Sequence, residues 1–195
     1  MLFNQEKLLH KNDQSINKFK HLNYTLSRIK CSQKVIELKR VTKVVKGGKI
    51  MTYRAIVILG NNNNKVGIGV GSADDAAFAI KKACANGKQN LIIAPITKLA
   101  SIPAFIKVSY GASKIIMRPA CEGYGIKASG SIKTICEYAG IKNISIKQLG
   151  SNNILNNVKA TFLALIALKQ KVEFLKTQSS NKYKIYTKLM KNIRI

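Results

Sequence analysis

The chain is poor in acidic residues. Of its 195 residues, eight are Asp or Glu and 34 are Lys or Arg, so the formal net charge is +26 at pH 7. Charge of this size repels itself in a compact fold, and a polyanion normally neutralises it. So few carboxylates also leave little material for catalytic acid–base pairs. The balance favours nucleic acid as the partner over a merely solvated basic surface.

Cysteine and histidine are also scarce, which bears on metal binding. No two cysteines have the two-residue gap of a zinc knuckle, and only two histidines could supply imidazole ligands. The residues concerned are Cys31, Cys84, Cys121, Cys136, His10 and His21. We therefore predict no metal, no cofactor and four reduced, buried thiols.

Long apolar runs and nucleotide-binding loops are missing as well. The longest apolar run, Ala160–Leu168, is far shorter than the roughly 18–20 residues of a membrane span. The glycines in Gly67-x-Gly69-x-Gly71 lack the spacing of a dinucleotide loop, so we interpret them as a site of close packing. No serine or cysteine nucleophile motif includes a histidine. We expect no membrane partner and no enzymatic activity.

The segment Val35–Ile58 is the most informative stretch that is present. Two runs rich in β-branched residues flank a Lys46-Gly47-Gly48-Lys49 corner, which is typical of a β-hairpin. A plain turn would explain the glycines but not the density of cations on both arms. We predict that the hairpin binds RNA phosphates, through backbone and shape more than splayed bases. The predicted RNA-binding residues are Arg40, Lys43, Lys46, Gly47, Gly48, Lys49 and Arg54.

The segment after the hairpin predicts the rest of a first domain. A turn at Asn61–Asn64, where Asn tolerates left-handed conformations, precedes a strand at Lys65–Gly71. A helix should begin at a Ser72/Asp75 capping box and stop near Asn86-Gly87. The order β-β-β-α is that of a double-stranded-RNA-binding-like domain.

Alternating strands and helices follow and indicate a two-layer α/β domain. We expect strands near Phe105–Val108, Lys114–Arg118 and Asn143–Leu149, and helices over Ser131–Ala139 and Asn153–Lys169. A short linker between Pro95 and Pro103 should separate the two domains. The predicted organisation is a basic N-terminal extension (1–33), a first domain (34–95), a second domain (104–169) and a basic C-terminal tail (170–195) that folds only against RNA.

A series of different short motifs extends from about residue 34 to about residue 169. They are Arg40-Val41-x-Lys43-Val44-Val45-Lys46-Gly47-Gly48-Lys49, Val66-Gly67-x-Gly69-x-Gly71, Ser101-Ile102-Pro103, Arg118-Pro119-Ala120-x-Glu122-Gly123-x-Gly125-Ile126, Glu137-x-Ala139-Gly140, Leu149-Gly150-Ser151-x-Asn153 and Lys159-Ala160-Thr161. Together they resemble the fifth protein of the bacterial-type small ribosomal subunit. The resemblance implies an α+β fold: a double-stranded-RNA-binding-like N-terminal domain and a C-terminal two-layer α/β domain with a left-handed βαβ crossover.

The resemblance also implies a function and partners. The protein would be a structural constituent of the small ribosomal subunit that supports translational accuracy, and its hairpin loop would reach small-subunit rRNA near the decoding region. Gly125 and Lys133 match the contact with the neighbouring fourth small-subunit protein. The eighth small-subunit protein, and mRNA where it enters the subunit, are further expected partners. A free double-stranded-RNA-binding regulator, which needs only the first domain, is the alternative.

The chain departs from the family pattern at several positions, and its composition hints at its origin. The departures are Ala104, Tyr124, Ser129, Ile154 and Asn157, with Lys in place of Arg at Lys133 and Lys159. Basic residues divide into 29 Lys and 5 Arg, a bias typical of AT-rich genomes. We therefore predict a plastid ribosome, with the cytoplasm of an AT-rich bacterium or a mitochondrion as alternatives.

Overall fold

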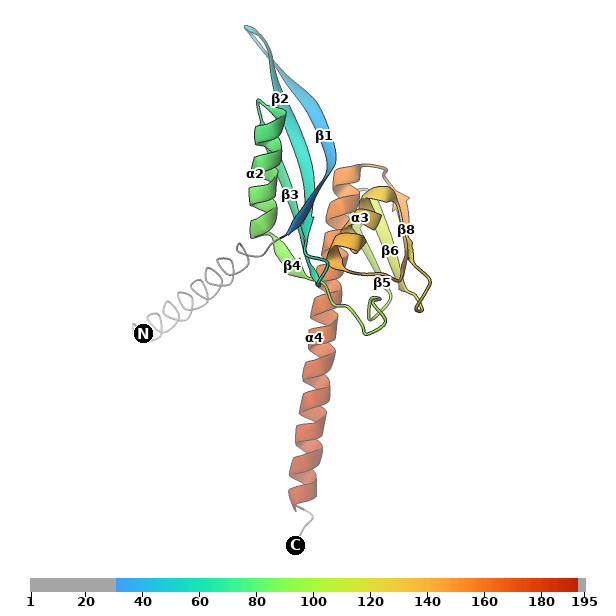
Figure 1. Cartoon of the computed structure of the whole chain (residues 1–195). Coiled ribbons are helices and arrows are strands. Elements are labelled where there is room, and N and C mark those ends of the chain that lie inside the picture. Colours follow the sequence, from blue (N-terminus) through green and yellow to red (C-terminus); the bar gives the residue numbers. More distant parts are fainter. Residues whose placement is uncertain (1–30, 193–195) are drawn as a thin grey trace, which may run out of the picture. The chain divides into compact units, whose positions relative to one another are not determined.

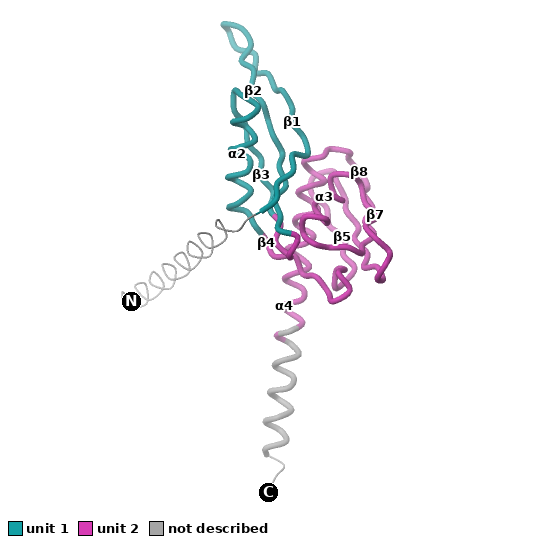
Figure 2. The backbone as a smooth tube through the Cα atoms, in the orientation of Figure 1, with its two compact units in different colours: residues 1–61, 67–91 teal, residues 62–66, 92–195 magenta. Residues whose placement is uncertain are grey.

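The computed structural model describes residues 31–192, which form two compact units (Figure 2). Within that range, unit 1 comprises residues 31–61 and 67–91, and unit 2 comprises residues 62–66 and 92–192. Unit 1 is a sheet with one helix, and unit 2 is a sheet with two helices (Figure 1). The predicted α+β fold class is confirmed. The N-terminal extension lies almost entirely outside the described residues.

Unit 1 is built on a long β-hairpin. Its strands are β1 (Ser32–Val45), β2 (Gly48–Gly60), β3 (Lys65–Ala73) and β4 (Leu91–Ile93), in the sheet order β1-β2-β3-β4, and its helix is α2 (Ala76–Gln89). Residues 65–66 of β3 and 92–93 of β4 continue these strands into unit 2. The antiparallel pairing of β1 with β2 confirms the predicted hairpin. Sequence patterns did not predict β4, because three residues are too few to display a period.

The glycines of β3 let α2 lie directly against that strand. A Cβ atom added to Gly69 would collide with the carbonyl oxygen of Ala83, and one added to Gly67 would lie 2.5 Å from the carbonyl oxygen of Gly87. A Cβ atom on Gly71 would lie 2.5 Å from the amide nitrogen of Ala83. The interpretation of these glycines as a close-packing site is therefore confirmed.

Both predicted ends of α2 are wrong. Ser72 lies in β3, and the N-cap is Asp75, whose side chain makes no capping hydrogen bond. The Asn86-Gly87 pair lies inside the helix and not after it. Contacts with β3 override the local stop signal, because the Asn86 amide donates to the Val70 carbonyl (2.8 Å) and Gly87 packs on Gly69.

The asparagine turn adopts the predicted conformation. Asn62 and Asn64 have φ of 57° and 69°, in the left-handed region that asparagine tolerates. This turn belongs to unit 2, where the Asn62 amide donates to the Tyr138 carbonyl (3.1 Å) and the Asn64 amide to the Ala139 carbonyl (3.0 Å). The conformation of the turn is therefore held by hydrogen bonds to the last residues of the helix Gly130–Ala139, as well as by the tolerance of asparagine for positive φ.

Unit 2 places two helices on one face of a four-stranded sheet. Its strands are β5 (Ile106–Tyr110), β6 (Ser113–Pro119), β7 (Ile126–Lys127) and β8 (Ile144–Gly150), in the order β5-β6-β8-β7, and its helices are α3 (Gly130–Ala139) and α4 (Ile154–Asn192). β7 and β8 are parallel and flank α3 in the sequence, so they form a βαβ unit. Ile115, Met117, Ile144, Ile132 and Leu165 are fully buried between the two layers.

Two parts of unit 2 differ from the sequence-based expectation. The strand β7 was not predicted, because two residues are too few to display a period. The segment predicted as a linker is packed: Ser101 and Ile102 are 3% and 1% exposed, and the Ala120 amide donates to the Ser101 hydroxyl (3.1 Å). This hydrogen bond ties the segment to the end of β6.

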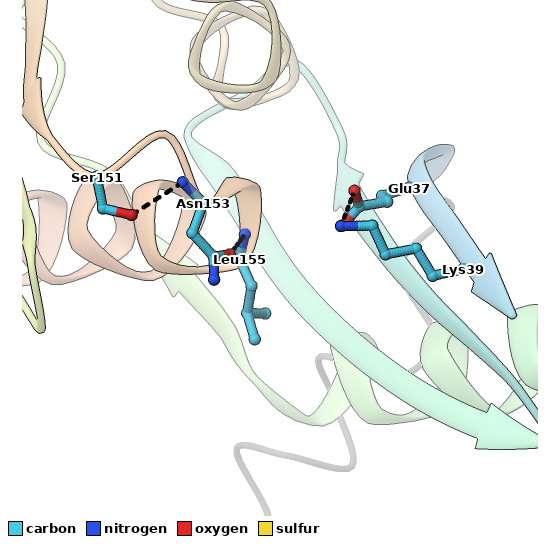
Figure 3. A network of polar contacts seen from close by, with 5 residues as sticks. All are labelled: Glu37, Lys39, Ser151, Asn153 and Leu155. Atoms are coloured by element: carbon cyan, nitrogen blue, oxygen red, sulfur yellow. Dashed lines mark hydrogen bonds and ion pairs between the residues drawn. The ribbon is translucent and has the colours of Figure 1, made fainter. Parts of the chain in front are cut away.

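α4 begins where it was predicted but ends much later. The Leu155 amide donates to the Asn153 side-chain oxygen (3.0 Å), and the Asn153 amide donates to the Ser151 hydroxyl (3.2 Å), as Figure 3 shows. These bonds satisfy amides that a helix start leaves unpaired. The predicted end at Lys169 is wrong, because the helix continues to Asn192. Residues 170–192 contain neither glycine nor proline to stop it.

Candidate nucleic-acid interface

The tip of the β1–β2 hairpin is a two-residue turn with open surroundings. Val45 pairs with Gly48, so Lys46 and Gly47 form the turn itself. Gly48 has φ of +136°, a conformation that side chains rarely adopt. A Cβ atom added to Gly47 or Gly48 would meet nothing within 4 Å. Among the described residues, the tip packs against nothing, and Figure 1 shows the hairpin extending past the end of α2.

The predicted RNA-binding residues are all on the surface of this hairpin. The five cations among them are exposed, and no ion pair between described side chains engages any of the five: Arg40, Lys43, Lys46, Lys49 and Arg54. Pairing places Lys43 beside Ile50 and Arg54 beside Lys39 on one face of the ribbon. Arg40 lies beside Tyr53 on the other face. Closer to the base of the hairpin, this second face packs on α2. The hairpin therefore presents positive charge on both faces and at its tip.

Glu37 is the one acidic residue of the hairpin, and it is engaged. Its carboxylate lies 2.7 Å from the Lys39 ammonium (Figure 3). The Glu37 side chain is 16% exposed and that of Lys39 is 65% exposed. An ion pair this close to solvent contributes little stability. It does, however, direct the only negative charge of β1 and β2 toward Lys39.

Exposed apolar side chains accompany the cations, and sequence reasoning did not count them as part of the site. Val44 is 73% exposed, Ile50 and Met51 are 53% each, and Val41 is 39%. In the sequence, the β-branched residues among them, Val41, Val44 and Ile50, indicate only a strand. Apolar surface grouped on one protruding element is typical of an interface. The tip therefore combines charge for phosphate with apolar area that a partner can cover.

A second set of predicted residues lies in unit 2. Gly125 has φ of +75°, and its amide donates to the Asn143 side-chain oxygen (3.1 Å). Asn143 is 6% exposed and also donates to the Leu99 carbonyl (2.8 Å), so it fixes the loop that carries Gly125. Lys133 is exposed on α3 and lies 4.0 Å from Glu137. Sequence reasoning used Asn143 only as the start of a strand and missed this positioning role.

Three positions that depart from the family pattern have clear surroundings. Tyr124 is 43% exposed, and the Lys127 ammonium lies 4.1 Å from the centre of its ring, so its bulk is accommodated at the surface. Ser129 is the N-cap of α3 and makes no side-chain capping bond. Asn157 is 2% exposed, and its side-chain oxygen has no hydrogen-bond partner among the described residues. Such a buried acceptor destabilises the fold.

The four cysteines are free thiols in different environments. Cys84 and Cys136 are buried as predicted, but Cys31 is half-buried and Cys121 is exposed, so the prediction is wrong for those two. Burial raises the pKa of Cys136 to about 12, with the neighbouring Glu137 adding to the effect. Burial also raises the pKa of Cys84, which Lys88 partly opposes. The buried thiols therefore stay protonated and unreactive near neutral pH.

Among residues 31–192, no three or more His, Cys, Asp or Glu side chains gather into a possible metal site. In the same range, no helix is long and apolar enough to cross a membrane.

Models of known protein families match residues in both units. The family model described as the N-terminal domain of ribosomal protein S5 matches residues 31–95, and that of the C-terminal domain matches residues 108–177. The small ribosomal subunit protein uS5c of Trieres chinensis is 53% identical over 154 residues, which are 79% of this chain and 83% of that protein.

Relatives from two other organisms match to a similar degree. The uS5c protein of Rhodomonas salina is 53% identical over 137 residues, covering 70% of this chain and 82% of that protein. The small ribosomal subunit protein uS5 of Nostoc punctiforme is 51% identical over 137 residues, covering 70% and 78%. The likeness spans most of the relatives' own length, so it concerns whole proteins and not one shared domain.

Proposed function

The chain belongs to the ribosomal protein S5 family, and we propose that it is a structural constituent of a small ribosomal subunit whose β1–β2 hairpin binds small-subunit rRNA. The observation that carries this proposal is the open, cation-bearing hairpin tip. Its glycines leave the backbone bare, so a phosphate chain can approach Lys46 and Lys49 without steric conflict. The role is structural, and no catalytic step is part of it.

The hairpin would hold rRNA chiefly by charge. Each ammonium or guanidinium that neutralises a phosphate releases counterions, which provides affinity that weakens as salt rises. The bound surface would also bury Val44 and Ile50, which are exposed in the free protein. Lysine lacks the planar fork of arginine, so the tip residues would position the hairpin on the backbone and not read particular bases.

The finer roles concern neighbouring proteins. We propose that Gly125 and Lys133 contact the fourth small-subunit protein, and that this contact supports translational accuracy. Asn143 holds the Gly125 loop in one conformation, and Lys133 is exposed, which suits both residues to an interface. The eighth small-subunit protein, and mRNA where it enters the subunit, complete the proposed set of partners.

We further propose that the chain works in a plastid ribosome as two domains, at residues 34–95 and 104–169. The uS5c relatives and the strong preference for Lys over Arg support the compartment. The separate matches of the two family models to residues 31–95 and 108–177 support the division.

Sedimentation tests the proposed function directly. A tagged copy of the chain, expressed in Nostoc punctiforme, whose own uS5 is 51% identical, should travel with the small subunit after lysis in mild salt. A matched variant with Lys43→Gln, Lys46→Gln and Lys49→Gln should be lost from subunits at lower salt than the parent chain. Persistent absence of the parent chain from small subunits would overturn the proposal.

A further inference from the structure

The face of the unit 2 sheet that α3 and α4 leave uncovered carries its own set of residues. Partners across paired strands share a face, and Ile116 pairs with both Lys107 and Lys147, while Ser145 pairs with both Arg118 and Lys127. All of these side chains are half-buried or exposed, whereas the alternate residues Ile115 and Met117 are fully buried. This outer sheet face consists of Lys107, Ser109, Lys114, Ile116, Arg118, Lys127, Ser145, Lys147 and Leu149.

The outer sheet face carries charge of one sign. Five of its nine residues are cations, and β5, β6, β7 and β8 contain no acidic residue. The described acids of unit 2 lie elsewhere: Glu122 precedes β7 in a loop, Glu137 is on α3 near Lys133, and Glu173 is on α4 near Lys169. Positive charge is therefore concentrated on the sheet, where nothing in its own strands neutralises it.

A shallow hollow in this face has the chemistry of a phosphate site. It has a volume of about 250 Å³ and is lined by Ile116, Arg118, Ser145 and Lys147. A guanidinium, an ammonium and a hydroxyl group, all of which donate hydrogen bonds, therefore line one hollow. Arg118 adds the planar fork that binds two phosphate oxygens at once, which the hairpin's lysine tip lacks.

We propose that the outer sheet face is a second RNA-binding surface, which holds the phosphate backbone of duplex RNA with one phosphate seated between Arg118 and Lys147. The proposal rests on the proposed function, since the RNA would be rRNA of the same subunit. The face shares no residue with the hairpin or with the pair Gly125 and Lys133. Its residues come from four strands between residues 106 and 150, so no single sequence motif predicts it.

The composition of the face favours duplex RNA over other anionic partners. None of its nine residues is aromatic. One exposed ring, that of Tyr124, lies against the face with its centre 4.1 Å from the Lys127 ammonium, and it does not make a row of rings on which successive unpaired bases could stack. A protein partner would normally find an apolar centre with aromatic anchors. Here the apolar members are Ile116, which is half-buried, and Leu149, which is 41% exposed. Cations surround them, so backbone contact is the interaction that the surface fits.

Salt-dependent binding of the full chain to a labelled RNA hairpin with a 20-base-pair stem tests this surface. Arg118→Gln with Lys147→Gln should lower the slope of log affinity against log salt by about 1, since the one phosphate that the two side chains hold contributes about 0.9. The matched control is Lys98→Gln with Lys142→Gln, which removes the same charge from exposed positions of unit 2 outside the face. The control should lower the slope by much less.

The same pair of substitutions should be repeated in a background with Lys43→Gln, Lys46→Gln and Lys49→Gln. Equal losses in both backgrounds would support an independent second surface, because the effects of sites that do not interact add. A hairpin triple variant with unchanged slope would count against the hairpin's proposed role while leaving this surface standing. An unchanged slope for the Arg118 and Lys147 variant in both backgrounds would overturn the second surface.

Competing probes separate the possible occupants, and a second variant guards against misfolding. Unlabelled duplex should displace the label well, whereas preferential displacement by single-stranded RNA or by poly-glutamate would overturn the assignment to duplex RNA. If circular dichroism shows that the Arg118 and Lys147 variant is unfolded, Lys107→Gln with Lys114→Gln should lower the slope by about 2, because both side chains are exposed on the same face.

Discussion

Two glycine-containing segments of unit 1 differ in what surrounds them. At the hairpin tip, added Cβ atoms on Gly47 and Gly48 would meet nothing within 4 Å. On β3, a Cβ atom at Gly67, Gly69 or Gly71 would strike the backbone of α2. Two glycine motifs thus have different roles. The glycines of the hairpin tip leave the backbone accessible to a partner, and those of β3 allow α2 to pack closely on the strand.

The strand β2 has one packed half and one exposed half. Its second half contributes Ala55, Val57 and Leu59, each 0% exposed, to the core against α2, while Ile50 and Met51 in its first half are 53% exposed. The packed half anchors the strand, and the other half carries cations outward. This comparison predicts that substitutions in the packed half change stability, whereas those at the tip change binding.

The largest effect is expected from Gly69→Ala. The new methyl group would collide with the Ala83 carbonyl, and backbone on both sides leaves little room to adjust, so we expect a loss of about 3 kcal/mol in the free energy of unfolding. Urea denaturation measures it. Gly47→Ala is the matched control and should change stability by less than about 0.5 kcal/mol. Equal effects of the two substitutions would contradict the difference between an open tip and a packed strand β3.

A smaller effect separates the two glycines of the tip from each other. Gly48→Ala should lower the free energy of unfolding by about 1–2 kcal/mol, because alanine is strained at φ of +136° even where space is open. Gly47 has no such φ, so Gly47→Ala lacks this penalty. Thermal unfolding of both variants measures the difference. Identical melting temperatures would mean that the turn changes conformation to relieve the strain.

Thiol titration extends the contrast between packed and open positions to unit 2. Burial raises the pKa of Cys136 to about 12 in the folded chain, above its ordinary value of 9.0. The unfolded thiol therefore loses its proton first, so this contribution to stability is complete below pH 9 and is lost as pH rises toward about 12. Going from pH 8 to pH 10, wild type should lose about 1 kcal/mol more than Cys136→Ala.

Denaturation at both pH values measures this loss, and labelling gives an independent check. At pH 8, a maleimide should modify the exposed Cys121 quickly and the buried Cys136 only after unfolding. Equal labelling rates for the two thiols in the folded protein would contradict the assigned burial. A pH dependence that is the same in wild type and Cys136→Ala would place the alkaline loss on other groups.

The features that could be predicted from sequence are those whose cause is local. Alternating β-branched residues and a glycine corner define the hairpin, and asparagine's tolerance of positive φ defines the turn at Asn62 and Asn64. The end of α2 was predicted wrongly because Asn86 and Gly87 are a stop signal only in isolation. In the fold, both residues make contacts with β3 that keep them helical.

The candidate surfaces divide in the same way. The hairpin cations lie within one stretch of sequence, so their charge density was visible without a structure. The outer sheet face gathers Lys107, Arg118, Lys127 and Lys147 from four strands, and their order in the sheet is not their order in the chain. The β5–β6 pairing brings Lys107 near Arg118, and the pairing of β8 between β6 and β7 adds Lys147 and Lys127, so no local pattern could identify the whole set.

The smallest expected effect on stability, and a clear one on binding, belongs to Lys49→Glu at the tip. Lys49 is exposed and pairs across the ribbon with Val44, so its replacement disturbs no packing and should change the free energy of unfolding by less than about 0.5 kcal/mol. It should weaken rRNA association and lower the salt slope by about 1, as should Lys46→Glu. A filter-binding titration between 50 and 200 mM salt, roughly the range over which phosphate contacts weaken, measures the slope. An unchanged slope would show that the tip is solvated in the complex, and the open glycines would then need another explanation.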